Sequence, residues 1–255
     1  MSSYPELEGK VAVVMGGSRG IGLATAERLA RNGMSVGIVA RGVDAVEDAV
    51  AAIRHDGGRA VGVPADATNL TASERARDQI ESELGAVDFV AAFAGSGNAR
   101  PGPVHELSED DWHSTVDGNL TATFLTLKTF LPGMIQRRGG SVVTMASSAG
   151  RIPTPSAPAP YAAAKAAIVM LTRHAASQLG EYGVRVNCLS PSTVLTERTS
   201  QHMPEQFKER LIALHPLGRL GEPADVADAA CFLASDSASW LTGLVVDVAG
   251  GAVML

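Results

Sequence analysis

The sequence predicts an α/β protein built on a doubly wound, mostly parallel sheet of seven strands, with helices on both faces. Short apolar runs rich in β-branched residues alternate about seven times with longer amphipathic stretches, and a glycine-rich turn joins the first pair. Parallel strands that are buried on both faces read as continuous apolar runs, and crossover helices connect them. We interpret residues 1–255 as a single domain, because α/β folds of this length commonly form one unit.

The expected elements follow this rhythm in order. Strands are expected at 11–15, 36–40, 60–63, 89–93, 141–146, 184–189 and 244–248. Helices are expected at 21–31, 44–55, 72–84, 110–135, 161–182 and 224–233. Prolines fix φ and remove hydrogen-bond donors, so the proline-rich segment 152–160 is expected to be a stiff extended loop.

A long insertion at about 193–220 interrupts the alternation, and only its part at 205–214 has a helical pattern. Insertions of this length in a compact domain are often active-site lids, although a plain surface excursion gives the same pattern. His202 and His215 lie in this insertion and are candidates for contact with a substrate, although isolated histidines more often have no such role.

The composition favours small molecules as partners. The 27 acidic residues outnumber the 21 basic ones, and no basic block is present to neutralise phosphates, which argues against nucleic-acid binding. Neither a long apolar run nor a signal-like N-terminus occurs, so we expect no membrane contact and a cytoplasmic location. Cys188 and Cys231 lie in apolar segments without metal-ligand spacing, which predicts buried reduced thiols and no metal site.

A glycine-rich turn, Gly16-Gly17-Ser18-Arg19-Gly20-Ile21-Gly22, follows the first expected strand and opens the first expected helix. In open α/β sheets this turn binds a dinucleotide pyrophosphate, because glycines let the ligand approach the backbone and the helix N-terminus presents free N–H groups. The spacing differs from the common Gly-x-Gly-x-x-Gly, and a tight turn that only packs helix on strand gives the same pattern. Its place in the first strand–helix unit favours the dinucleotide.

The end of the second expected strand indicates which dinucleotide is bound. An acidic residue at this point binds the ribose 2′-hydroxyl of NAD, whereas an arginine accepts the 2′-phosphate of NADP. Here the strand runs into Arg41, with no acidic residue before Asp44, and Arg19 in the glycine turn offers a second cation. We therefore expect NADP(H) rather than NAD(H); the alternative is that both arginines are only solvated.

Tyr161 and Lys165 are one helical turn apart and share a helix face. A cation at this distance favours the tyrosinate, which a phenolic general acid/base requires. The spacing alone is weak, since an exposed helix pair shows it as well. The fifth expected strand, however, ends in Ser147 and Ser148 and brings hydroxyl groups to the sheet edge where ligands of such folds bind.

With these motifs the chain resembles the short-chain dehydrogenase/reductase family, of the single-domain type with a Rossmann sheet, from about Leu7 to the C-terminus. The matching pieces are the glycine turn, Asp66, Ala94-Gly95, Asn119-Leu120, Ser147, Tyr161-x-x-x-Lys165, Arg185-Val186-Asn187 leading to Pro191, Pro216-Leu217-Gly218-Arg219 and Gly250-Gly251. The resemblance implies hydride transfer between NADP(H) and a carbonyl or secondary alcohol. It also implies a homotetramer or homodimer formed through the long helices.

The resemblance further implies roles for individual residues. Tyr161 would exchange the substrate proton, Ser147 would bond the substrate oxygen, and Lys165 would hold the nicotinamide ribose. Asn119 would hold a relay water, Asp66 would contact the adenine, and Thr196 the carboxamide. The cofactor-binding set it implies comprises Gly16, Ser18, Arg19, Gly20, Ile21, Gly22, Arg41, Asp66, Ala94, Gly95, Tyr161, Lys165, Pro191, Val194 and Thr196.

Two serines compete for the substrate contact. Counting back from Gly150 at the strand end selects Ser147, whereas counting back from Tyr161 by the family's usual spacing selects Ser148. The two side chains point to opposite sides of an extended chain. We prefer Ser147, because the proline-rich loop can absorb an extra residue.

The chain departs from the family pattern at three places, one of which is Met15, where the family has Thr before the first glycine. Ala92-Phe93 stands where the family usually has Asn-Asn, and Ser192 stands where it has glycine after Pro191. These departures motivate an alternative, a dinucleotide-binding regulatory protein with little or no turnover. An enoyl reductase is a further alternative, which the three-residue gap between Tyr161 and Lys165 disfavours because those relatives typically use a wider gap.

Overall fold

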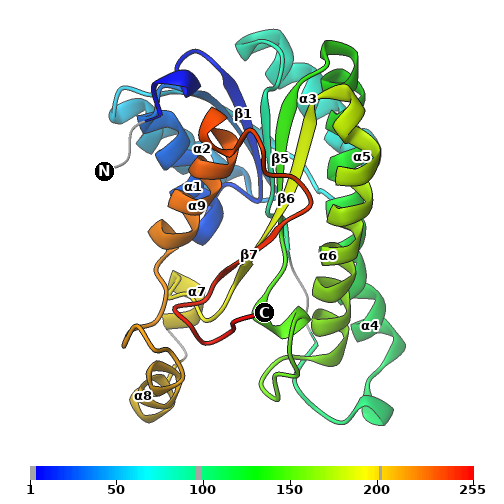
Figure 1. Cartoon of the computed structure of the whole chain (residues 1–255), viewed down its shortest axis with the longest axis vertical. Coiled ribbons are helices and arrows are strands. Elements are labelled where there is room, and N and C mark those ends of the chain that lie inside the picture. The colour runs from blue at the N-terminus through cyan, green and yellow to red at the C-terminus, as the bar shows by residue number, and fades with distance from the viewer. Residues whose placement is uncertain (1–3, 96–98, 201–202) are drawn as a thin grey trace.

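The computed structural model describes residues 4–95, 99–200 and 203–255, and it confirms the predicted fold class (Figure 1). In this part of the chain seven parallel strands form one sheet in the order β3-β2-β1-β4-β5-β6-β7. The strands are β1 (Val11–Met15), β2 (Ser35–Ala40), β3 (Arg59–Pro64), β4 (Phe89–Ala92), β5 (Gly140–Met145), β6 (Val184–Pro191) and β7 (Val245–Val248). All seven lie close to their expected ranges.

Helices cover both faces of the sheet. The helices are α1 (Gly20–Arg31), α2 (Val43–His55), α3 (Leu70–Leu84), α4 (Glu109–Val116), α5 (Ala122–Arg137), α6 (Ala159–Leu179), α7 (Glu197–Ser200), α8 (Glu205–Ala213) and α9 (Pro223–Ala234). Figure 1 shows α1, α2 and α9 on one face, and α3, α5 and α6 on the other.

The side chains of each central strand alternate between the two helix layers. Val14 of β1 packs in the apolar cluster that contains Leu29 of α1. Its neighbour Val13 packs in the cluster that contains Ile80 of α3. Both valines are fully buried, so the strand has no solvent-facing side.

The winding of the sheet reverses at β1. This strand pairs with β2 on one side and with β4 on the other, so the chain runs outward in one direction through β3 and then in the other through β7. Ligands of open α/β sheets bind in the crevice outside the carboxyl ends of the strands at such a point. The glycine turn after β1 lies there.

The stretch expected as one helix at 110–135 is helical throughout, but it is not a uniform α-helix. The structure divides it into α4, a π-helical turn at Asp117–Thr121, and α5. The side-chain amide of Asn119 donates to the carbonyl of Thr115 (2.8 Å) and so gives it a partner outside the regular ladder. π-Helical turns inside helices are often found at functional positions.

The prediction of an extended loop at 152–160 is wrong for its last two residues, which are helical. Helix α6 begins at Ala159, and Pro160 occupies its first turn. A proline is tolerated there because the first N–H groups of a helix have no intrahelical acceptor and the proline φ already suits a helix.

Gly22 supplies a test of the packing between α1 and β1. A Cβ on Gly22 would collide with the carbonyl oxygen of Gly16, which is backbone and cannot turn aside. We expect Gly22→Ala to lower the free energy of unfolding by about 3 kcal/mol in urea denaturation.

The matched control is Gly180→Ala, since Gly180 has a helical φ of −57° and a Cβ there meets open space. This change should be neutral or stabilising by up to about 1 kcal/mol. Equal losses from the two substitutions would contradict the packing account.

Candidate active site

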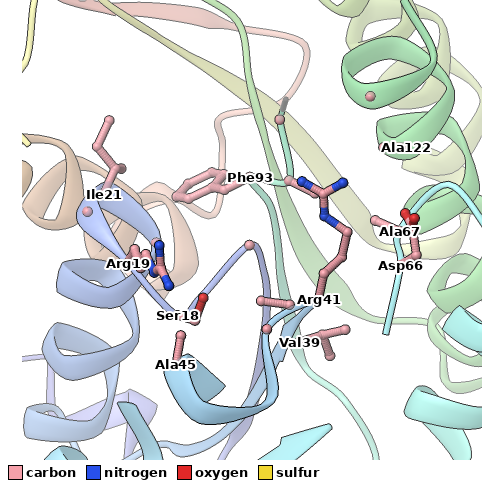
Figure 2. Close-up of a pocket in the computed structure, with 18 of the residues that line it drawn as sticks. Ser18, Arg19, Ile21, Val39, Arg41, Ala45, Asp66, Ala67, Phe93 and Ala122 are labelled. Atoms are coloured by element: carbon pink, nitrogen blue, oxygen red, sulfur yellow. The ribbon is translucent and has the colours of Figure 1, made fainter. Parts of the chain in front are cut away.

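A cavity of about 710 Å³ opens at the carboxyl ends of β1, β2 and β4 (Figure 2). Its volume is within the usual range for small-molecule and cofactor sites. Most of the cofactor-binding residues expected from the sequence line it: Gly16, Ser18, Arg19, Gly20, Ile21, Gly22, Arg41, Asp66, Ala94, Gly95 and Thr196.

The glycine turn forms the floor of this cavity through close backbone contacts. Gly16 has a φ of +83°, and its N–H donates to the carbonyl of Val39 (2.7 Å). A Cβ on Gly16 would lie only 2.9 Å from the backbone nitrogen of Ala94. The N-cap residue of α1, Arg19, makes no side-chain cap bond, so no side chain caps the first N–H groups of the helix. This cradle fits a dinucleotide pyrophosphate.

Two arginines stand at the rim of the cavity. Figure 2 shows Arg19 beside Ser18 in the glycine turn and Arg41 reaching across from the end of β2. Both are exposed, and neither lies within ion-pair distance of a carboxylate among the described residues. Each guanidinium is therefore available to an anionic ligand.

Asp66 lies on the wall of the cavity opposite the glycine turn. Its carboxylate accepts hydrogen bonds from the backbone N–H (2.9 Å) and the hydroxyl (2.8 Å) of Thr68. The bond from the Thr68 backbone contributes most to lowering the pKa of Asp66, and the positive charge of Arg41 adds to it. Asp66 is thus held as a charged acceptor.

Lys165 and Tyr161 lie near the inner end of the cavity. Lys165 is only 4% exposed, and its Nζ donates to the carbonyl of Met145, a cavity residue, at 2.9 Å. The Nζ is 5.5 Å from the centroid of the Tyr161 ring. Burial lowers the pKa of Lys165 to about 8.

Asn119 lies beside this pair, because the π-helical turn faces the end of β4. A Cβ on Gly95 would be 3.0 Å from Oδ1 of Asn119 and 3.8 Å from Nζ of Lys165. The end of β4, the π turn and α6 therefore meet at one point, and the missing side chain of Gly95 leaves the space between them.

Ser147 lies two residues beyond the end of β5 and is the N-cap of a short 3-10 turn at Ser148–Gly150. Its Oγ accepts from the backbone N–H of Ala149 (3.3 Å). A Cβ on Gly150 would lie 2.6 Å from backbone atoms of α6, so the turn packs tightly on the helix that carries Tyr161.

Some expected residues do not line the cavity. Tyr161, Lys165, Asn119 and Ser147 are near it but are not part of its lining. Pro191 ends β6, and Val194 forms an isolated bridge with Gly221. His202 lies outside the described residues, and His215 is buried and bonded to Leu211 and Ser192.

The sequence did not identify several residues of the cavity wall. Phe93, Ala45 and Ala122 line it (Figure 2). Phe93 directly follows β4, so its position at a strand end was a usable signal, whereas Ala45 and Ala122 reach the wall only through tertiary packing.

Two kinds of feature are absent from the described residues. They contain no group of three or more His, Cys, Asp or Glu side chains that could hold a metal ion. Among them there is also no helix long and apolar enough to cross a membrane.

A family model described as "Enoyl-(Acyl carrier protein) reductase" matches residues 16–253, which is most of the chain. The chain belongs to the short-chain dehydrogenase/reductase family. A 2,3-dihydro-2,3-dihydroxybenzoate dehydrogenase of Bacillus subtilis (strain 168) is 34% identical over 97% of both chains. A cyclohexanol dehydrogenase of Rhodococcus sp. (strain TK6) is 36% identical over 98% of both.

Solved structures of the family agree with this assignment. A 3-oxoacyl-[acyl-carrier protein] reductase from Brucella melitensis, with bound NAD, matches with a TM-score of 0.91 and 35% identity over 99% of this chain and 94% of that one. The protein is therefore an oxidoreductase of this family with a fold suited to a nicotinamide dinucleotide.

The buried Lys165 predicts a specific dependence of stability on pH. Its pKa falls from 10.5 to about 8 on folding, so the unfolded chain binds more protons between these values. The free energy of unfolding should rise as pH increases from about 8 to about 10.5, by up to about 3 kcal/mol.

Urea denaturation across this pH range tests the effect, with Lys165→Met as the comparison. The Lys165→Met variant should lack this rise, whereas Lys128→Met, at an exposed position on α5, should keep it. Parallel pH profiles for the wild type and Lys165→Met would show that burial of Lys165 is not the cause.

Proposed function

We propose that this protein is an NADP(H)-dependent oxidoreductase that moves a hydride between the cofactor and a carbonyl or secondary alcohol, with Tyr161 as the general acid/base. The observation that carries the proposal is the cluster near the inner end of the cavity. There a buried ammonium lies beside a phenol ring, next to Asn119 and the end of β5. The insertion at 193–220 of this single domain is proposed to be the lid.

When bound, NADPH supplies the hydride that adds to the carbonyl carbon. In this direction the Tyr161 hydroxyl donates its proton to the carbonyl oxygen, while Ser147 donates a hydrogen bond to the same oxygen. The Lys165 ammonium stabilises the tyrosinate that remains. Because the pKa of Lys165 is about 8, this side chain can also release and regain a proton near neutral pH. In the reverse direction Tyr161 accepts the proton of the alcohol.

The two free arginines support NADP(H) over NAD(H). A 2′-phosphate placed near Arg41 and Arg19 would meet two guanidinium groups that have no carboxylate within ion-pair distance among the described residues. Asp66 follows β3 in the chain, whereas the acidic residue that selects NAD stands at the end of β2, where this chain has Arg41.

The names of two relatives suggest the class of substrate. Cyclohexanol and 2,3-dihydro-2,3-dihydroxybenzoate both carry secondary alcohols on a six-membered ring. We propose ring-borne secondary alcohols and the corresponding ketones as substrates.

We further propose a homodimer or homotetramer. It would form through α5 and α6, where Phe124 and Met170 are exposed apolar side chains.

Tyr161→Phe tests the mechanism. Removal of the hydroxyl should lower kcat at least about a hundredfold, because a positioned general acid contributes about 10²–10⁴-fold. NADPH binding, measured by fluorescence titration, should persist, and Tyr182→Phe, in the 3-10 turn Gly180–Tyr182 that follows α6, serves as the control. Turnover that survives in Tyr161→Phe would overturn the mechanism, whereas tight NADPH binding without turnover of any carbonyl compound by the wild type would favour the regulatory alternative.

Arg41→Ala tests the cofactor preference. Charge-assisted hydrogen bonds contribute about 1.5–3 kcal/mol, so the Kd for NADPH should rise about tenfold to a hundredfold. The Kd for NADH should change less than about threefold, since NADH lacks the 2′-phosphate.

The control for this substitution is Arg75→Ala, which removes an exposed arginine of α3 that is not part of the cavity lining. Wild-type protein that binds NADH about tenfold more tightly than NADPH would refute the proposed preference.

A further inference from the structure

His215 joins two segments of the chain through both of its ring nitrogens. It is only 5% exposed, with Nδ1 at 2.7 Å from the carbonyl oxygen of Leu211 and Nε2 at 3.0 Å from Oγ of Ser192. A carbonyl oxygen can only accept, so Nδ1 carries a hydrogen and donates it to Leu211. Nε2 and the Ser192 hydroxyl form the second hydrogen bond, in which a hydroxyl can serve as donor or acceptor.

These two bonds connect the end of α8 to the end of β6. Leu211 lies in the last turn of α8, where its carbonyl also accepts from the backbone N–H of Leu214 (3.1 Å), and Ser192 directly follows β6. The backbone N–H of Ser192 donates to the carbonyl of Val248 (3.3 Å), which fixes Ser192 to the last residue of β7. One imidazole therefore ties the helix of the insertion to the central sheet.

The residues around His215 are tightly packed. Gly250 and Gly251 follow β7 with φ values of +55° and +85°. A Cβ on Gly251 would lie 2.8 Å from Pro216, and one on Gly250 would lie 3.4 Å from the His215 ring. The double glycine thus allows the chain after β7 to pack directly against His215 and Pro216.

Helix α8 itself has little support from the rest of the molecule. None of its residues is buried, and Figure 1 shows it standing apart from the helix layers that cover the sheet. Phe207 is 42% exposed, and Leu214, at the end of the helix, is 65% exposed. Its orientation therefore depends on how its ends are held.

We propose that Ser192 and His215 form a latch that positions α8 over the substrate side of the cleft and so controls substrate affinity. The segment between Ser192 and α8 contributes Thr196 and Glu197 to the cavity wall, so the latch is continuous with the cofactor cleft. A glycine at position 192 would have no hydroxyl to offer His215. The expected effect on substrate affinity rests on the proposed function, whereas the hydrogen-bonded latch does not.

Hydrogen–deuterium exchange measures the latch without any need for catalysis. Loss of one hydrogen bond corresponds to about 1 kcal/mol, so Ser192→Ala should speed exchange of the α8 amides about fivefold. Ser192→Thr keeps the hydroxyl and should exchange nearly as the wild type does. Ser177→Ala is the matched control, because the Ser177 hydroxyl bonds only to the carbonyl of His174 on its own helix.

A second pair of variants tests whether the serine acts through the histidine. In a His215→Gln background, the further change Ser192→Ala should add little to the exchange of α8. Additive increases in exchange would mean that the two residues act separately and would overturn the latch.

Steady-state kinetics with a ring-borne alcohol tests the role in substrate binding. Ser192→Ala should raise the substrate KM, by no more than the factor seen in exchange, and KM should change more than kcat. A changed Kd for NADPH with unchanged exchange of the α8 amides would make Ser192 a cofactor contact and overturn the proposal. Faster exchange of these amides with an unchanged substrate KM would overturn it as well. If no substrate is turned over, the proposed function fails, while the exchange data still decide whether the latch exists.

Discussion

The close approach of the glycine turn to the end of β4 determines where the site lies. A side chain on Gly16 would collide with the backbone of Ala94, and one on Gly22 would collide with the carbonyl of Gly16. The residues of β1 are buried on both faces, so the strand cannot move aside to relieve such a collision. The end of β1, the start of α1 and the end of β4 are therefore held together by backbone packing. The cavity opens beside them because the sheet reverses its winding at this point.

In this rigid surrounding the burial of the Lys165 ammonium is energetically costly. Its ammonium is buried, and no carboxylate of the described residues lies within ion-pair distance of it. A carboxylate would stabilise the charge and raise the pKa. With the carbonyl of Met145 and the ring of Tyr161 as its neighbours, the pKa of Lys165 stays at about 8. Burial of this ammonium therefore lowers the stability of the fold, and it leaves a group that can exchange a proton near neutral pH.

Structure that depends on residues close together in the chain could be predicted from the sequence. Most contacts between residues far apart in the chain could not. The strands were predicted well, because a fully buried parallel strand must be a continuous apolar run. The π-helical turn was missed, because its cause is a bond from the side chain of Asn119 to a backbone carbonyl, which hydrophobic periodicity does not encode. The bond between Ser192 and His215 joins residues 23 positions apart, so only the folded chain reveals it. The motifs identified much of the cavity wall, and tertiary packing supplied Ala45 and Ala122.

The departure at Ala92-Phe93 changes how the end of β4 is packed, and it leaves the proposed proton-transfer residues Tyr161 and Lys165 in place. Ala92 is almost fully buried in β4, where an amide would need a polar partner inside the sheet. The Phe93 backbone donates to the carbonyl of Met15 (3.0 Å), and its ring packs against the apolar core while lining the cavity (Figure 2). Packing thus replaces side-chain hydrogen bonding at the end of β4. The hydrogen bond of the Lys165 ammonium goes to the carbonyl of Met145 in β5, not to a residue of β4. The departure in β4 therefore gives little support to the alternative of a regulatory protein without turnover.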